Sequence, residues 1–118
     1  MAFKFEKLEV WELALLYADL IYEIAKQLPR SEEYNLKGQI VRSVTSIALN
    51  IAEGSTSQSD AEQGRFVGMA LRSCVETVAC LQLIKRRKYI AEGPFEVAYA
   101  FAEKLFAKLQ AFRRSLRG

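Results

Sequence analysis

Residues 39–55 read QIVRSVTSIALNIAEGS, and this stretch decides the fold that we expect for the chain. Its apolar residues recur at steps of three and four: Ile40, Val44, Ile47 and Ile51. This spacing is typical of one face of an α-helix. Asn35 is a good N-cap and Gly54 is a good residue to follow the last turn, so we predict a helix between them. A helix with an apolar face needs partners that cover this face.

Two more segments show the same periodicity on either side of this helix. The first runs from about Leu8 to Leu28, where Pro29 prevents the helix from continuing. The second begins at Ser59, which forms a capping box with Glu62, and runs to about Tyr89. Both segments are therefore predicted to be helices that pack on the helix between Asn35 and Gly54.

The last segment has the clearest heptad pattern in the chain. It follows the predicted turn at Gly93-Pro94. Its apolar residues are Ala98, Ala102, Leu105, Leu109, Phe112 and Leu116. Because the links between the four predicted helices are short, neighbouring helices must run antiparallel. We predict an all-α fold, an up-down-up-down antiparallel four-helix bundle, with residues 1–118 forming a single domain.

Composition argues against several classes of function. The 118 residues include no histidine, which is the commonest general base and metal ligand, so we expect no enzymatic activity, no metal and no cofactor. Cys74 and Cys80 lie in one predicted helix with their Cα atoms about 9 Å apart, too far for a disulfide. Two free thiols indicate a cytoplasmic protein. No apolar run approaches the ~20 residues of a membrane span, so we expect no membrane partner.

The first predicted helix has two apolar stripes where a bundle needs one. Leu8, Trp11, Leu15, Ala18, Tyr22 and Ala25 form one stripe, and Leu13, Tyr17, Leu20, Ile24 and Leu28 form the other. Phe101 likewise lies outside the stripe of the fourth helix. An apolar face left over after packing usually marks an interface, so we predict a homo-oligomer that Tyr17→Glu or Leu20→Glu would weaken. The alternative is that these residues are scattered surface hydrophobes.

Polar residues interrupt the apolar stretch of residues 39–55. At 100° per residue Arg42, Asn50 and Glu53 share a side of the helix away from its core stripe, and Glu76 borders the core face of the third helix. Our preferred interpretation is a hydrogen-bonded polar border of Arg42, Asn50, Glu53 and Glu76. This border would set the register of these two helices, or of one subunit on the next. The functional alternative is a pair of carboxylates, Glu53 and Glu76, in acid–base or metal chemistry.

Several motifs along the chain resemble one known family. They are Phe5, Leu8, Val10 and Trp11 near the start, the block from Gln39 to Ser55, and the later Phe66, Ala70, Ser73 and Glu76. This pattern, centred on Q-I-x-R-S…S-I-x-x-N-I-A-E-G, is similar to that of the bacterial four-helix-bundle proteins encoded by intervening sequences of 23S ribosomal RNA genes. Two positions depart from the family pattern: Ala48 replaces a frequent proline, and Arg72 replaces a small residue.

The resemblance implies an up-down bundle that assembles as a ring of five subunits. It also implies no enzymatic activity, because none is established for the family. Related accessory proteins of diversity-generating retroelements bind nucleic acid and a reverse transcriptase. The resemblance therefore makes RNA or DNA an expected partner, and another protein the alternative.

Basic residues concentrate in the second half of the chain. Residues 65–118 contain eleven Lys and Arg against four Asp and Glu. The candidate nucleic-acid-binding residues close two predicted helices: Lys85, Arg86, Arg87 and Lys88 at one end of the bundle, and Arg113, Arg114 and Arg117 at the other. Such contacts would be to phosphates, so charge reversal at Arg86 and Arg87 should weaken binding to all sequences alike. The alternative is that cations at helix C-termini only stabilise the helix dipole, and that the protein is an adaptor or scaffold for another protein.

Overall fold

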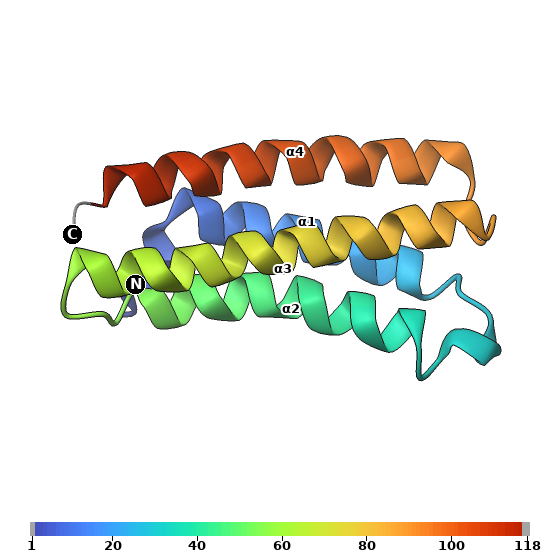
Figure 1. The fold of residues 1–118 in the computed structure, drawn as a ribbon, viewed down its shortest axis with the longest axis horizontal. Helices are drawn as coiled ribbons and strands as arrows, with labels where there is room; N and C mark the ends of the chain where they lie inside the picture. The colour runs from blue at the N-terminus through green and yellow to red at the C-terminus, as the bar shows by residue number, and fades with distance from the viewer. Residues whose placement is uncertain (1, 117–118) are drawn as a thin grey trace.

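The computed structural model describes residues 2–116 and consists of helices and their links. The four long helices are α1 (Glu9–Ala25), α2 (Leu36–Gly54), α3 (Asp60–Arg86) and α4 (Glu92–Ser115), and two short 3-10 helices are η1 (Lys4–Lys7) and η2 (Arg30–Glu32). The long helices alternate in direction, up-down-up-down (Figure 1). The predicted antiparallel four-helix bundle is confirmed.

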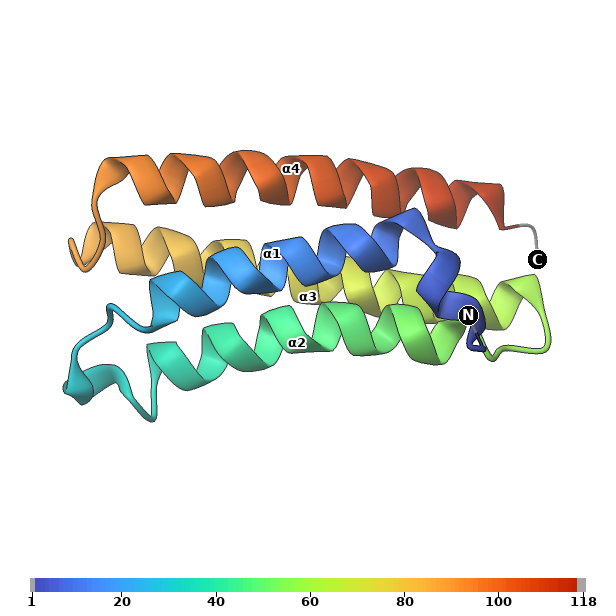
Figure 2. The same ribbon diagram turned by 180° about the vertical axis from the view of Figure 1, so that it is seen from behind.

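Each long helix packs on two neighbours, so the bundle is a closed square in cross-section. α1 contacts α2 and α4, and α3 contacts the same two helices from the opposite corner. The bundle measures 43 × 24 × 23 Å, and η1 and the end of α4 lie at the end of the bundle that holds the α2–α3 link (Figures 1 and 2). Residues at the start of α3 therefore lie beside residues at the end of α4.

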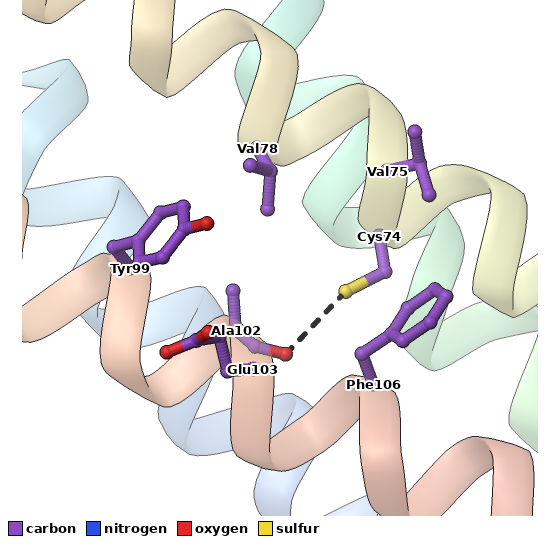
Figure 3. Close-up of a pocket in the computed structure, with 7 residues that line it drawn as sticks. All are labelled: Cys74, Val75, Val78, Tyr99, Ala102, Glu103 and Phe106. Carbon is purple, nitrogen blue, oxygen red and sulfur yellow. Dashed lines mark hydrogen bonds between the residues drawn. The ribbon is translucent and has the colours of Figure 1, made fainter.

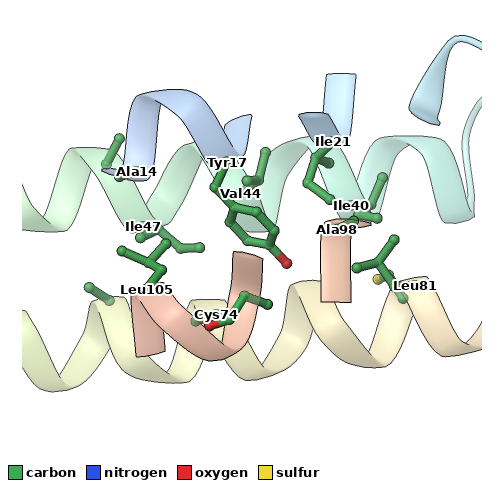
Figure 4. Packing of buried hydrophobic residues seen from close by; sticks show 14 of the residues in the cluster. Ala14, Tyr17, Ile21, Ile40, Val44, Ile47, Cys74, Leu81, Ala98 and Leu105 are labelled. Atoms are coloured by element: carbon green, nitrogen blue, oxygen red, sulfur yellow. Dashed lines mark hydrogen bonds between the residues drawn. The ribbon is translucent and has the colours of Figure 1, made fainter. Parts of the chain in front are cut away.

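The core lies along the axis between the four helices (Figure 4). Its largest fully buried side chains are Tyr17, Ile21, Ile40, Ile47, Ile51, Leu81, Ile84, Leu105, Leu109, Val44, Val67 and Thr77. All four residues of the helical stripe in residues 39–55 are buried, as its spacing predicts. In α2 this packing follows from apolar periodicity, because the helix buries one continuous face.

The burial of α1 corrects one expectation about assembly. We expected the stripe of α1 that contains Tyr17 to lie at a subunit contact. This stripe instead faces the core of the same chain, and Tyr17 is 0% exposed. Phe101 stacks on Tyr17 with ring centroids 6.0 Å apart, so the Phe101 ring also packs within the chain. Tyr17→Glu would therefore break the core of one subunit and cannot report on assembly. The large apolar residues that α1 exposes are Leu15, Leu16 and Tyr22, at 38%, 50% and 43%.

The pair α2 and α3 makes the most extensive contact between helices. Two features set its register. The buried hydroxyls of Ser43 and Thr77 lie 2.8 Å apart, and Thr77 donates to the carbonyl of Ser73 at 2.8 Å. At the end of α2, Gly54 faces Phe66 so closely that a Cβ on Gly54 would lie 2.8 Å from the Cβ of Phe66. Small residues thus bring these two helices together.

The start of α2 and the start of α3 are capped differently. Asn35 is the N-cap of α2, but its side chain makes no capping bond. Glu32 replaces it, accepting hydrogen bonds from the backbone N–H of Leu36 at 3.4 Å and from the Asn35 amide at 2.9 Å. At α3 the Ser59 hydroxyl accepts from the N–H of Glu62 as predicted, while the Glu62 carboxylate accepts from the N–H of Gln58. In the predicted capping box the Glu62 carboxylate would accept from the N–H of Ser59, whereas in the structure its donor is the residue before Ser59.

Two predicted helix boundaries also change. Gly93 and Pro94 do not form the turn before α4 but lie within its first turn, where proline is tolerated because its missing N–H has no partner to lose. The turn lies earlier, at Lys88, whose φ of 62° is in the left-handed region. The N–H of Lys88 bonds to the carbonyl of Lys85, and the N–H of Tyr89 to that of Ile84, which is the Schellman pattern of a helix end.

Candidate nucleic-acid interface

The two predicted basic groups lie at opposite ends of the bundle, as the topology requires (Figure 1). At the α3–α4 link, one of the four predicted cations forms an ion pair within the described chain. Lys85 forms an ion pair with Glu92 at 3.3 Å and lies 4.3 Å over the ring of Phe95. A hydrogen bond from Tyr89 holds the pKa of the Glu32 carboxyl below its usual range, and the nearby charge of Arg87 acts in the same direction. Arg86 and Lys88 are exposed.

At the other end, arginines from α3 and α4 surround one surface hollow of about 480 Å³. Arg65 and Arg72 come from α3, and Arg113 comes from α4. Arg114 lines a second hollow of about 310 Å³ that shares Arg113 with the first. We call these four residues and the first hollow the arginine hollow. Arg117, the remaining predicted residue of this group, lies outside the described residues.

Gly68 gives the arginine hollow its shape. It is buried in α3, and a Cβ at this position would lie 3.1 Å from two atoms of the Arg113 guanidinium. The guanidinium therefore lies across the backbone of α3, in space that any side chain at position 68 would share. The floor beside it is apolar, formed by Met69, Val75 and Phe106. The exposed arginine side chains thus border an apolar surface.

None of the four arginines has a carboxylate within ion-pair distance among residues 2–116. Along α3, Glu62 lies three residues before Arg65 and Glu76 lies four residues after Arg72, but neither carboxylate is within ion-pair distance of these arginines. The helix dipole explains only part of the arrangement. Arg113 and Arg114 lie in the last turn of α4, where a cation is favoured, but Arg65 and Arg72 lie in the first half of α3, where it is not. Their positive charge is therefore not accounted for by helix stability.

A smaller, apolar hollow of about 190 Å³ continues the arginine hollow along α3 and α4 (Figure 3). The two hollows share Val75 and Phe106. The rest of the apolar hollow is lined by Cys74, Val78, Tyr99, Ala102 and Glu103. Together the two hollows form one groove between α3 and α4, with its positive charge at one end. We call this the α3/α4 groove.

The predicted polar border does not form within one chain. Arg42, Glu53 and Glu76 are exposed, and no hydrogen bond or ion pair joins any two of the four residues in the described part of the chain. Asn50 donates to the carbonyl of Ser46 on its own helix at 2.9 Å. The buried Ser43–Thr77 contact sets the register of α2 and α3 instead. A border between subunits stays a prediction.

The alternative pair of carboxylates is also corrected. Because Ser43 is level with Thr77 and Gly54 with Phe66, Glu53 lies about nine residues from Glu76, or roughly 14 Å along the axis. Two carboxylates at this separation cannot share a proton or a metal ion. Residues 2–116 contain no group of three or more Cys, Asp or Glu side chains placed to hold a metal. The absence of enzymatic activity stays a prediction.

Sequence reasoning named Arg113 and Arg114 as candidate binding residues but did not include Arg65 or Arg72 among them. A run of cations such as residues 85–88 is conspicuous, whereas Arg65 and Arg72 are single arginines seven residues apart. Their spacing, which puts them two turns apart on one helix face, was the available signal. The departure of Arg72 from the family pattern was a second signal. A single sequence gives no indication that Gly68 makes room for Arg113.

The apolar character of α3 extends beyond its core face. An 18-residue window of this helix has a mean hydropathy of 1.4, enough by length and composition for a membrane span, and 44% of the window is buried in the bundle. Core helices of water-soluble proteins meet the same criterion, so this is weak evidence of a membrane. Exposed Met69, Val75 and Leu83 contribute to the value. Such residues outside the core fit a surface that another molecule covers.

Both cysteines are free, as their spacing predicts, and both are buried. Burial raises the pKa of the Cys74 thiol to about 11, and the Sγ of Cys74 lies 4.0 Å from the carbonyl of Ala102 (Figure 3). A thiol with a raised pKa is a poor nucleophile, so Cys74 is an inert part of the groove wall. The cytoplasmic location that the thiols indicate stays a prediction.

Comparison with known proteins gives the relationship of the chain. The family model described as "23S rRNA-intervening sequence protein" matches residues 6–111. A crystal structure of a protein of unknown function from the S23 ribosomal protein family of Bacteroides thetaiotaomicron VPI-5482 is similar, with a TM-score of 0.81 and 30% sequence identity over 88% of this chain and 97% of that chain. No curated protein is significantly similar. The chain therefore belongs to the family of 23S rRNA-intervening sequence proteins.

Proposed function

We propose that the protein is a non-enzymatic, homo-oligomeric helical bundle that binds RNA or DNA through basic residues at its helix ends. The observation that carries this proposal is the arginine hollow, where Arg65, Arg72 and Arg113 converge from two helices without a carboxylate partner among the described residues. Guanidinium groups are the preferred donors to phosphate oxygens. RNA and DNA present such phosphates repeatedly along their backbones.

The end of the bundle that carries the arginine hollow supports this function better than the Lys85–Lys88 end. Carboxylates already neutralise part of the latter group, whereas the cations of the arginine hollow keep their charge available. Each phosphate neutralised by an arginine releases counterions, which makes affinity fall steeply with salt. One hollow makes few contacts, but several copies in an oligomer multiply them on one strand.

Charge reversal of Arg65 and Arg72 tests the proposal. We expect Arg65→Glu/Arg72→Glu to weaken binding to RNA and DNA about tenfold or more, for all sequences alike, because two phosphate contacts become repulsive. Fluorescence anisotropy with structured RNA, single-stranded RNA and duplex DNA at ~50 and ~200 mM salt measures this, since several phosphate contacts change affinity clearly over this range. No binding at the lower salt would contradict the proposal.

The matched control is a double reversal at the other end of the same helix, Arg86→Glu/Arg87→Glu. It changes the net charge by the same amount and affects exposed residues. A smaller effect there would place the interface at the arginine hollow. An equal effect would mean that binding depends on total charge only.

The oligomer is proposed from the apolar residues that α1 exposes. Leu16 is 50% exposed, and charged Glu12 and Asp19 surround it on the outer face. We expect Leu16→Glu to reduce the mass measured by light scattering at micromolar concentration from that of the assembly, five subunits by family resemblance, to that of smaller species. Val97→Glu is the control, because Val97 is 56% exposed on α4. A monomeric mass for the unmodified protein would rule out the oligomer.

The competing function is that of an adaptor or scaffold for another protein. It is favoured by Leu49 on α2 and Leu83 on α3, which are 52% and 53% exposed. In that case the arginine reversals would leave partner binding unchanged and Leu49→Glu or Leu83→Glu would abolish it. The anisotropy experiment separates the two functions, because an adaptor would bind no nucleic acid at ~50 mM salt.

A further inference from the structure

We infer that the α3/α4 groove binds single-stranded nucleic acid, with phosphates on the arginine hollow and an unpaired base in the apolar hollow against Phe106. This inference rests on the proposed nucleic-acid binding and adds the form of the ligand. It follows from what the two adjoining hollows offer. One is bordered by arginine charge, and the other is almost wholly apolar.

The shape of the groove favours a single strand over a duplex. A duplex presents a convex rim of phosphates and keeps its bases stacked inside, so it can reach the arginines but cannot fill a hollow behind them. A single strand can turn a base out of its backbone and place it on an apolar or aromatic surface. The half-buried ring of Phe106 lines both hollows, and in the apolar hollow it lies beside Cys74 (Figure 3).

The charges in the groove give the strand an orientation. Glu103 lies at the apolar hollow, with no ion-pair partner within the described chain, and its carboxylate repels a phosphate there. A base is tolerated at this end because its amino group can donate to a carboxylate. Arg113 and Arg72 hold the phosphates at the opposite end. The order of charges along the groove thus favours phosphate at the arginine end and a base at the apolar end.

The test compares three ligands of equal length at ~50 mM salt, a concentration at which phosphate contacts are strong. They are a labelled single-stranded RNA, its duplex, and an abasic strand with the same phosphates. We expect the single strand to bind about tenfold more tightly than the abasic strand, the usual range for one stacked base. Phe106→Leu keeps an apolar side chain of similar size, and we expect it to remove this preference while binding to the abasic strand is unchanged.

Phe112→Leu is the matched control, because Phe112 is a half-buried phenylalanine of the same helix that lines a different hollow, with Leu8 and Val10. It should leave the preference intact. Equal affinity for the single and abasic strands, or a Phe106→Leu variant that still prefers the single strand, would overturn this inference but leave the proposed function standing. No binding to any of the three ligands would overturn both.

Light scattering on Phe106→Leu provides the second readout. If a second copy of the chain covers the groove, this substitution would lower the mass of the assembly, and that outcome would also overturn the inference. An unchanged mass together with a lost base preference is the expected result.

Discussion

Replacing Gly54 with alanine is expected to destabilise the bundle by about 2 kcal/mol, although alanine is the better helix former. The added Cβ would lie 2.8 Å from the Cβ of Phe66, 3.5 Å from its Cγ and 3.7 Å from the Cγ of Gln63. The shortest contact joins two Cβ atoms, so no rotamer change relieves it, and α2 and α3 must move apart. Overpacking of this kind costs about 1–3 kcal/mol, more than the propensity gain at a helix end.

Gly64→Ala on α3 is the matched control. No atom lies within 4 Å of a Cβ at this position, so alanine should stabilise the helix by up to about 1 kcal/mol. Thermal unfolding by circular dichroism measures both variants, and we expect their melting temperatures to shift in opposite directions. A Gly54→Ala variant as stable as Gly64→Ala would show that the two helices can separate without cost.

Gly54 also shows where sequence reasoning about the fold reaches its limit. Its place at the end of the apolar run predicted the end of α2 correctly, and α2 does end at this residue. Gly54 was also expected to follow the last turn, but it is the last residue of α2, and no glycine in the described part of the chain has the positive φ that is common just after a helix. The reason for glycine is the neighbouring helix, and a contact between residues far apart in sequence leaves no local pattern.

Helix α1 shows a second limit. Periodicity identifies which residues share a face of a helix, but when two faces are apolar it does not identify which one turns inward. The deciding factor is the position of α2 and α4 on either side, which the pattern of α1 does not contain. In α4, by contrast, a single stripe made the prediction unambiguous, and Ala98, Ala102, Leu105 and Leu109 are all buried.

The candidate site was predictable in the same uneven way. Arg113 and Arg114 stand together at a helix end, which a charge count finds directly. Arg65 and Arg72 gain their meaning only when α3 and α4 are placed side by side, because they then face Arg113 across one hollow. A site built by tertiary contacts between single residues requires the structure.

The largest effect on folding is expected at Tyr17. Its side chain is 0% exposed and points from α1 into the core, toward Cys74 of α3 (Figure 4). Glutamate at this position would bury a charge without a partner, which costs more than the stability of a domain of this size provides. We expect Tyr17→Glu to be unfolded by circular dichroism. A folded Tyr17→Glu variant would mean that the core of the bundle is open to water.

Phenylalanine at the same position should have the opposite effect. The Tyr17 hydroxyl has no hydrogen-bond partner among the described residues, and a buried unpaired hydroxyl costs about 1–3 kcal/mol. Tyr17→Phe removes this hydroxyl and keeps the stack on Phe101, whose ring lies 6° from parallel. We therefore expect the variant to be more stable by about 1 kcal/mol in urea unfolding at neutral pH. A loss of stability would mean that the hydroxyl has a partner, such as a buried water.

The advantage of Tyr17→Phe should grow in alkali. Burial, with smaller contributions from Cys74 and Cys80, raises the pKa of the Tyr17 hydroxyl far above its ordinary value, so the folded protein keeps this proton. The unfolded chain releases it above about pH 10, and each further unit of pH then costs the folded state up to about 1.4 kcal/mol. Cys74 adds a similar loss between pH 9 and about 11, because its own pKa is raised from 9.0 to about 11, but this loss is common to both proteins. Urea unfolding at pH 7 and at about pH 11 measures the difference in the free energy of unfolding between Tyr17→Phe and the unmodified protein, and we expect this difference to be larger at the higher pH. An unchanged difference would mean that the hydroxyl ionises as easily in the folded state as in the unfolded chain.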